Sequence, residues 1–158
     1  MKSKGSKAAG KAKVSEKNEK RAQALVLIVD DVPDNRAIYA DFLRFSGYEV
    51  VEATDGYEAV ELAKKRQPDV VLMDLSLPGM DGWEATRQIK NSSTTHHIKI
   101  IAVTGHALEG TAKGAREAGC DAFLSKPCLP ETLEAEIRRM LESTKTPKSK
   151  GGTRSKTV

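Results

Sequence analysis

Runs of mostly apolar residues recur along the middle of the chain and predict buried β-strands. Three such runs lie at residues 25–29, 70–73 and 98–103, and each passes directly into a polar residue. Runs of this kind are typical of strands that are covered on both faces, as in a parallel sheet. Shorter strand candidates lie at residues 50–51 and 122–124.

Helical periodicity occupies the segments between these strands. In the first segment Ile38, Phe42 and Phe45 recur at spacings of four and three, which indicates one apolar helix face. Strands that alternate with helices favour an α/β fold with a parallel sheet covered on both sides, a three-layer α/β/α sandwich. Helices are predicted at residues 34–46, 56–66, 82–91, 107–118 and 130–141.

The predicted helix at residues 107–118 is the weakest of these. It contains Gly110 and Gly114, which lower helix propensity, and Leu108 is its single large apolar residue. A helix with few large apolar side chains suits an element that shifts at a low cost in free energy. An ordinary short helix packed by alanines fits the same residues. Trp83 stands at the start of the helix before it, where we expect it to pack.

Charge is distributed unevenly along the 158 residues, whose formal net charge is +4. Residues 1–24 carry a net charge of +6 and residues 143–158 a net charge of +5, so residues 25–142 carry −7. The terminal segments lack the apolar residues that a core requires, and we expect basic disordered tails on either side of one acidic domain. An acidic domain is not the profile of a nucleic-acid-binding fold, so no specific nucleic-acid partner is expected.

The composition also bears on the cellular compartment. No apolar run approaches the ~20 residues that a membrane helix requires, and the lysine-rich N-terminus lacks the apolar stretch of a secretory signal. Cys120 and Cys128 do not make a disulfide framework, and neither has a His or second Cys at metal-ligand spacing. These features favour a cytoplasmic protein without a membrane partner.

Residues that can bind a metal or take part in a reaction follow the predicted strands directly. Asp30 and Asp31 come after the first strand, Asp74 after the third, Thr104 after the fourth and Lys126 after the fifth. Ligands of such folds bind at the carboxyl ends of the strands, so we expect these side chains to converge. Taken singly, an aspartate after a strand is often a turn or cap residue, and only the joint placement indicates a site.

The chemistry of this group points to a metal and a phosphoryl group. Three carboxylates at one sheet edge repel one another unless a cation lies among them, and oxygen donors without His or Cys suit Mg²⁺. Asp74 is then the candidate nucleophile, which would form an acyl phosphate. Lys126 and Thr104 are suitable donors to the phosphoryl oxygens, because phosphoryl transfer depends mainly on positioning and charge neutralisation.

Five segments resemble the receiver domains of response regulators and extend the resemblance over residues 25–142. The resemblance implies five parallel strands in the flavodoxin-like order 2-1-3-4-5. It also implies a phosphorelay, in which a histidine kinase or histidine phosphotransfer protein supplies the phosphoryl group. The segments are LVLIVDD at 25–31, VLMDL at 71–75, LPGMDG at 77–82, IAVTG at 101–105 and GCDAFLSKP at 119–127.

The same resemblance gives roles to the acidic residues and their neighbour. Asp74 matches the phosphoacceptor. Asp31 matches the carboxylate that binds Mg²⁺ directly, and Asp30 matches its partner, which usually acts through a water molecule. Ser76 matches the position that gives a backbone carbonyl to the metal.

Further positions match the switch of the family. Thr104 matches the switch hydroxyl, Lys126 the lysine that pairs with the phosphoryl group, and Phe123 the aromatic switch residue. Pro127 matches a proline that a cis peptide bond commonly precedes. A downstream protein is then expected to bind the surface formed by helix 107–118, strand 122–126 and helix 130–141.

The resemblance implies a signalling protein that promotes only its own phosphorylation and dephosphorylation, and not an enzyme with a separate substrate. We expect a stand-alone single-domain response regulator, because residues 143–158 cannot hold an output domain. The alternative that the chain is a receiver domain excised from a hybrid histidine kinase remains open. A phosphatase would usually carry a second aspartate where Ser76 stands, and a protein that binds nucleic acid through its tails would do so in a salt-sensitive manner.

Overall fold

The computed structural model describes residues 23–105 and 110–145, which form alternating strands and helices. Aspartates cap two helices: Asp55 accepts from the amide of Glu58, and Asp81 accepts from the amide of Glu84. In chain order the elements are β1 (Leu25–Val29), α2 (Pro33–Phe45), β2 (Glu49–Ala53), α3 (Gly56–Arg66), β3 (Val70–Asp74), α4 (Gly82–Lys90), β4 (Lys99–Thr104), α5 (Thr111–Ala118), β5 (Ala122–Ser125) and α6 (Pro130–Lys145).

The strands form one parallel sheet in the order β2-β1-β3-β4-β5, which confirms the predicted fold class. The register places Val29 of β1 opposite Met73 of β3, and Thr104 of β4 opposite Ser125 of β5. The carboxyl ends of four neighbouring strands therefore meet at one edge of the sheet.

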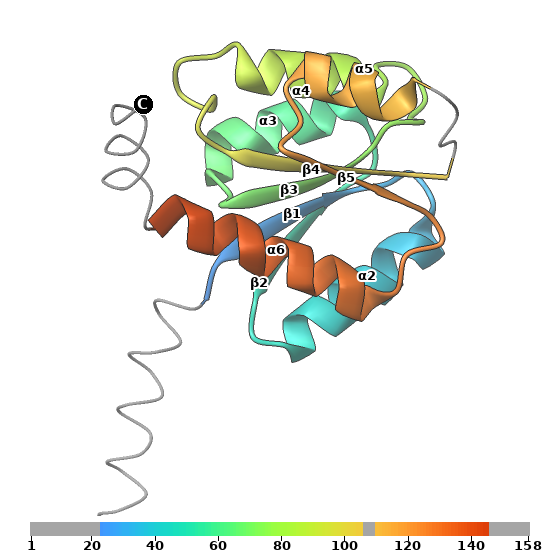
Figure 1. The fold of residues 1–158 in the computed structure, drawn as a ribbon, viewed down its shortest axis with the longest axis vertical. Coiled ribbons are helices and arrows are strands. Elements are labelled where there is room, and N and C mark those ends of the chain that lie inside the picture. The colour runs from blue at the N-terminus through green and yellow to red at the C-terminus, as the bar shows by residue number, and fades with distance from the viewer. Residues whose placement is uncertain (1–22, 106–109, 146–158) are drawn as a thin grey trace, which may run out of the picture.

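Helices cover both faces of this sheet, with α3, α4 and α5 on one side and α2 and α6 on the other (Figure 1). Successive strand residues contribute to separate hydrophobic clusters on the two sides. Leu27 and Met73 belong to the first cluster, whereas Ile28 and Leu72 belong to the second. Burial on both faces explains why the apolar runs in the sequence are nearly continuous.

The helix limits differ from the sequence predictions mainly in the second half of the chain. Helix α6 continues to Lys145, so the first residues of the expected C-terminal tail are helical. Helix α5 begins at Thr111, and residues 106–109, which include the predicted start of this helix, lie outside the described residues. Residues 1–22 and 146–158, most of the two predicted tails, also lie outside them.

The buried face of α2 is not the one that the apolar spacing predicted. Ile38 and Phe45 are 56% and 90% exposed, while Ala40 and Leu43 are completely buried and Phe42 is partly buried. Spacings of three and four fit more than one stripe of a helix, and the small Ala40 side chain allows close approach to the sheet. Two large apolar side chains consequently remain on the surface of α2.

Both cysteines are free thiols, as the sequence indicated. Cys120 is buried with its Sγ 3.9 Å from the hydroxyl of Thr86, and desolvation raises the pKa of its thiol to about 11. A thiol that stays protonated near neutral pH is a poor nucleophile. Within the described residues, no helix combines the length and the apolar character needed to cross a membrane.

Candidate functional site

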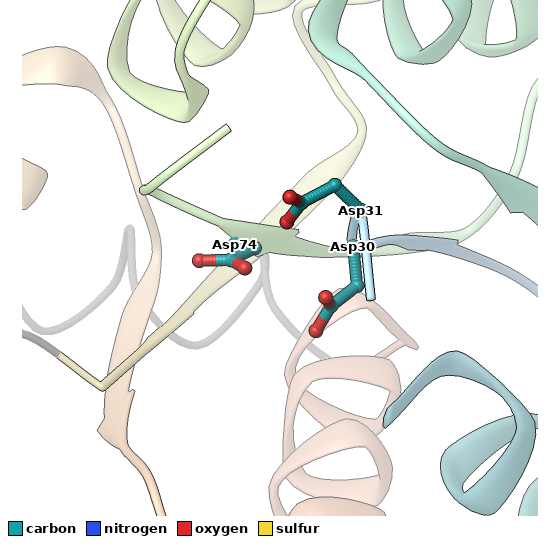
Figure 2. Close-up of side chains that lie close together, drawn as sticks. All are labelled: Asp30, Asp31 and Asp74. Carbon is teal, nitrogen blue, oxygen red and sulfur yellow. The ribbon is translucent and has the colours of Figure 1, made fainter. Parts of the chain in front are cut away.

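Three aspartate side chains gather where β1 and β3 end (Figure 2). Asp30 and Asp31 follow β1, and Asp74 is the last residue of β3. Each offers a carboxylate oxygen, and these oxygens lie within 4.8 Å of one another. Asp30 and Asp74 are buried while Asp31 is exposed, so the cluster is open to solvent on one side.

Lys126, directly after β5, brings a positive charge to this cluster. Its Nζ lies 2.9 Å from Oδ2 of Asp30 and 3.5 Å from Oδ2 of Asp74. The amide of Lys126 donates to the carbonyl of Thr104 at 2.8 Å, which fixes the backbone at this point. Desolvation alone would lower the pKa of Lys126, but the hydrogen bond to Asp30 and the charge of Asp74 raise it.

The carboxyl of Asp74 lies in an environment that disfavours its charge. Burial raises the pKa of Asp74, and the negative charge of Asp30 acts in the same direction. The amide of Ser76, which donates to Oδ1 of Asp74 at 3.0 Å, and the Lys126 ammonium both lower the pKa and offset part of this effect. A divalent cation would favour the ionised form further.

The backbone after β1 is held by residues of α2 and β2 that sequence reasoning did not single out. Arg36 donates from Nη1 to the carbonyl of Asp30 at 2.9 Å and from Nε to Glu52 Oε1 at 3.1 Å. The amide of Val32 donates to Oδ1 of Asp30 at 2.9 Å. A single arginine within an amphipathic helix gives no sequence signal for such a contact, because only the packing of α2 on β2 creates it.

The remaining predicted residues lie on the β4–β5 side of the site. Thr104 ends β4 and is buried, with 1% of its surface exposed. Phe123 of β5 lies opposite Ala102 of β4 and packs, partly buried, on the cluster that α3, α4 and α5 cover. The Lys126–Pro127 peptide bond is cis, as the resemblance implied.

The donor set fits a hard divalent cation. Asp30, Asp31 and Asp74 supply only carboxylate oxygens, and among the described residues neither a histidine nor a cysteine belongs to the cluster. Oxygen ligands of this type, partly open to water, are what Mg²⁺ prefers. Ser76 lies next to the cluster because its amide donates a hydrogen bond to Asp74. That its backbone carbonyl binds the metal stays a prediction.

Comparison with known protein families agrees with this arrangement. The family described as response regulator receiver domain matches residues 26–138, most of the described part of the chain. The chain belongs to this family. The receiver domain is thus a signalling module of a two-component system, and the partners of such modules are histidine kinases or phosphotransfer proteins.

Individual relatives of the receiver domain are similar over nearly their whole length. The polar-differentiation response regulator DivK of Brucella anthropi is 40% identical over 110 residues, which cover 69% of this chain and 89% of DivK. The receiver domain of the sensor histidine kinase PA1611 from Pseudomonas aeruginosa PAO1 has a TM-score of 0.71 and 35% identity, covering 76% of this chain and 98% of that one. That crystal structure contains a magnesium ion coordinated in the active-site cleft.

The chemotaxis protein CheY4 of Vibrio cholerae is another similar structure. It has a TM-score of 0.71 and 32% identity, and the match covers 75% of this chain and 98% of CheY4. The same receiver fold is thus found both in a named chemotaxis protein and within a sensor kinase.

Proposed function

We propose that this receiver domain accepts a phosphoryl group on Asp74 from a histidine kinase or a histidine phosphotransfer protein. The observation that carries the proposal is the carboxylate cluster of Asp30, Asp31 and Asp74, which Lys126 reaches from the end of β5. We assign Mg²⁺ binding to the three aspartates and to the backbone carbonyl of Ser76.

In the proposed reaction a carboxylate oxygen of Asp74 attacks phosphorus, and the bond between phosphorus and the donor histidine breaks to leave an acyl phosphate. Mg²⁺, when bound, supplies positive charge to the phosphoryl oxygens. Lys126 donates to one of these oxygens, and Thr104 donates its hydroxyl from the end of β4. The domain thereby promotes its own phosphorylation and dephosphorylation, without a separate substrate.

A hollow beside the cluster is the proposed docking point of the donor protein. It has a volume of about 470 Å³ and lies between the first turns of α2 and the loop after β5. Tyr39 connects its two walls by donating to the carbonyl of Cys128 at 3.1 Å. Ile38 lines it at 56% exposure, and Leu129 is exposed next to it. An apolar surface next to a phosphoacceptor suits a protein donor more than a small phosphorylated molecule.

The proposed output face consists of α5, β5 and α6. Phosphorylation adds negative charge at Asp74, which draws the hydroxyl of Thr104 and leaves space that Phe123 can enter. Such a switch is a population shift between two packings with a coupling of about 1–3 kcal/mol, so partner affinity is expected to change roughly 5- to 150-fold.

We propose a single-domain response regulator as the biological form. The match covers 89% of DivK, a response regulator with little sequence beyond the matched region, which supports this form. The similarity to a receiver domain of a sensor histidine kinase supports the alternative, a receiver that belongs to a hybrid kinase. The sequence of the genomic region that flanks the coding segment distinguishes the two.

Intact-mass spectrometry after treatment with acetyl phosphate and Mg²⁺ tests the phosphorylation directly. One phosphoryl group is expected on the wild-type protein and none on Asp74→Asn, because an amide is a poor nucleophile. The matched control is Asp41→Asn, which changes an exposed aspartate on α2 and is expected to react as the wild type does. An acyl phosphate on the Asp74→Asn variant would show that another residue accepts the group.

A further inference from the structure

Helix α4 begins against the backbone of the proposed phosphoacceptor. A Cβ atom on Gly82 would lie 2.2 Å from the carbonyl oxygen of Asp74 and 2.7 Å from the Cα of Leu75, so only glycine fits at this position. The amide of Gly82 donates to the carbonyl of Leu75 at 3.2 Å. Since closely packed groups cannot interpenetrate, the backbone at Asp74 cannot shift toward α4 without displacing the start of this helix.

The next residue, Trp83, extends the contact to α5. A Cβ atom on Gly114 would lie 2.3 Å from Cζ3 and 2.5 Å from Cη2 of the indole. The six-membered ring therefore rests against the bare backbone of α5, in space that any other side chain would occupy. Trp83 also packs on the hydrophobic cluster below α4. We refer to the contact between Trp83 and Gly114 as the indole seat.

Among the described residues, the packing of α5 relies mainly on small side chains. The helix is eight residues long, its N-cap Gly110 has a φ of 88° and no side-chain cap bond, and its buried residues are Ala115 and Ala118. The ion pair of Lys113 with Glu117 is exposed, with 4.0 Å between its charged atoms, and pairs of this kind contribute little. The indole therefore supplies bulk that the small side chains of α5 do not.

We infer that Trp83 is a positioning residue that passes a change in the backbone at Asp74 to α5 through the indole seat. The inference rests on the proposed phosphorylation of Asp74 and adds a second connection to the output face. This connection runs through α4, whereas the route through Thr104 and Phe123 runs along β4 and β5. A small displacement of Gly82 moves the indole, and the bare backbone at Gly114 must follow because packed contacts of this kind do not deform continuously.

Hydrogen–deuterium exchange of residues 111–118 in the full-length protein tests this relay. Each protein is compared with Mg²⁺ alone and with Mg²⁺ plus beryllofluoride, whose tetrahedral complex on a carboxylate resembles a phosphoryl group. Beryllofluoride is expected to change the exchange of α5 in the wild type. In Trp83→Phe, which lacks the two ring atoms nearest Gly114, the site should still bind beryllofluoride while the response of α5 is lost.

Two further variants separate a lost fit from a damaged helix. Gly114→Ala is expected to lose the α5 response as well, because its methyl group displaces the indole. The double variant W83F/G114A should regain it, since the methyl group fills space close to that which the smaller ring leaves. Lys113→Ala, one residue away on the exposed side of α5, is the matched control and keeps the wild-type response.

The outcomes distinguish this inference from the proposed function. A wild-type response of α5 in both single variants would overturn the relay, and so would a double variant that stays as impaired as the single ones. An exchange response around Asp74 in the wild type that leaves residues 111–118 unchanged would also overturn the relay alone. No response around Asp74 at all would contradict the proposed phosphorylation site itself.

Discussion

At the scale of single residues, Lys126 and Asp74 dominate the electrostatics of the site. The ammonium of Lys126 contacts both buried aspartates, yet one positive charge offsets only part of the charge of three carboxylates. Burial still raises the pKa of Asp74. The metal-free fold therefore tolerates an ionised carboxylate at a free-energy cost, and a cation that binds there stabilises the fold.

This cost predicts that Asp74→Asn stabilises the metal-free protein. An amide has no charge to desolvate and is not repelled by Asp30, so the free energy of unfolding is expected to rise by on the order of 1 kcal/mol. Urea denaturation in the presence of a chelator measures the change, and Asp41→Asn on the surface of α2 controls for the loss of one negative charge. Equal stabilisation in both variants would indicate a general charge effect instead.

The raised pKa of Asp74 also fixes the sign of a pH dependence. The folded state holds the Asp74 proton more tightly than the unfolded chain, whose aspartates have a pKa of about 3.9. The stability that protonation provides is fully present below the unfolded pKa and is lost as pH rises through the folded pKa. The advantage of Asp74→Asn should therefore be largest at neutral pH and vanish in acid, which denaturation at a series of pH values measures. An advantage that does not vary with pH would contradict the assignment.

At the scale of elements, the exposed side of α2 separates two apolar residues with different surroundings. Ile38 borders the hollow beside Lys126, whereas Phe45 lies seven residues further on, at the far end of the helix. Ile38→Glu is expected to slow phosphoryl transfer from a donor protein severalfold, because it places a charge in the proposed interface.

Phe45→Glu makes the same substitution on the same helix and serves as the control. It is expected to leave transfer from the donor protein unchanged, and neither variant should alter the reaction with acetyl phosphate. Transfer rates measured with radiolabelled donor decide the matter. A defect of Ile38→Glu with acetyl phosphate as well would place the fault in the site and not in docking.

The sequence predicted the elements better than it predicted their orientations. Nearly continuous apolar runs indicate strands buried on two faces, and the acidic residues at their ends then converge by topology alone. The stripe of α2 that faces the core could not be chosen in this way, because Ile38 and Phe45 fit helical spacing as well as Leu43 does. The contact between Trp83 and Gly114 depends on how α4 and α5 lie together, and no spacing along the chain encodes it.

At the scale of the whole molecule, the proposed phosphorylation site lies in an acidic domain while the termini are basic. A protein shortened to residues 23–145 is expected to react with acetyl phosphate at the wild-type rate, because the family match spans residues 26–138. Intact-mass spectrometry over a time course measures this rate. Any nucleic-acid binding of the full-length chain should fall steeply with salt and disappear on shortening. A large loss of phosphorylation in the shortened protein would show that a terminal segment contributes to the site.

The indole seat has an optical consequence. Trp83 is the single tryptophan of the chain, so ultraviolet emission from the native protein comes chiefly from the one ring that lies against α5. Because this ring is only partly buried, the wavelength of its emission maximum and its quenching by acrylamide depend on how closely Gly114 covers it. The unlabelled protein thus contains its own fluorophore at the junction of two helices. Stopped-flow traces of this emission would follow the helix junction within the time of a single reaction.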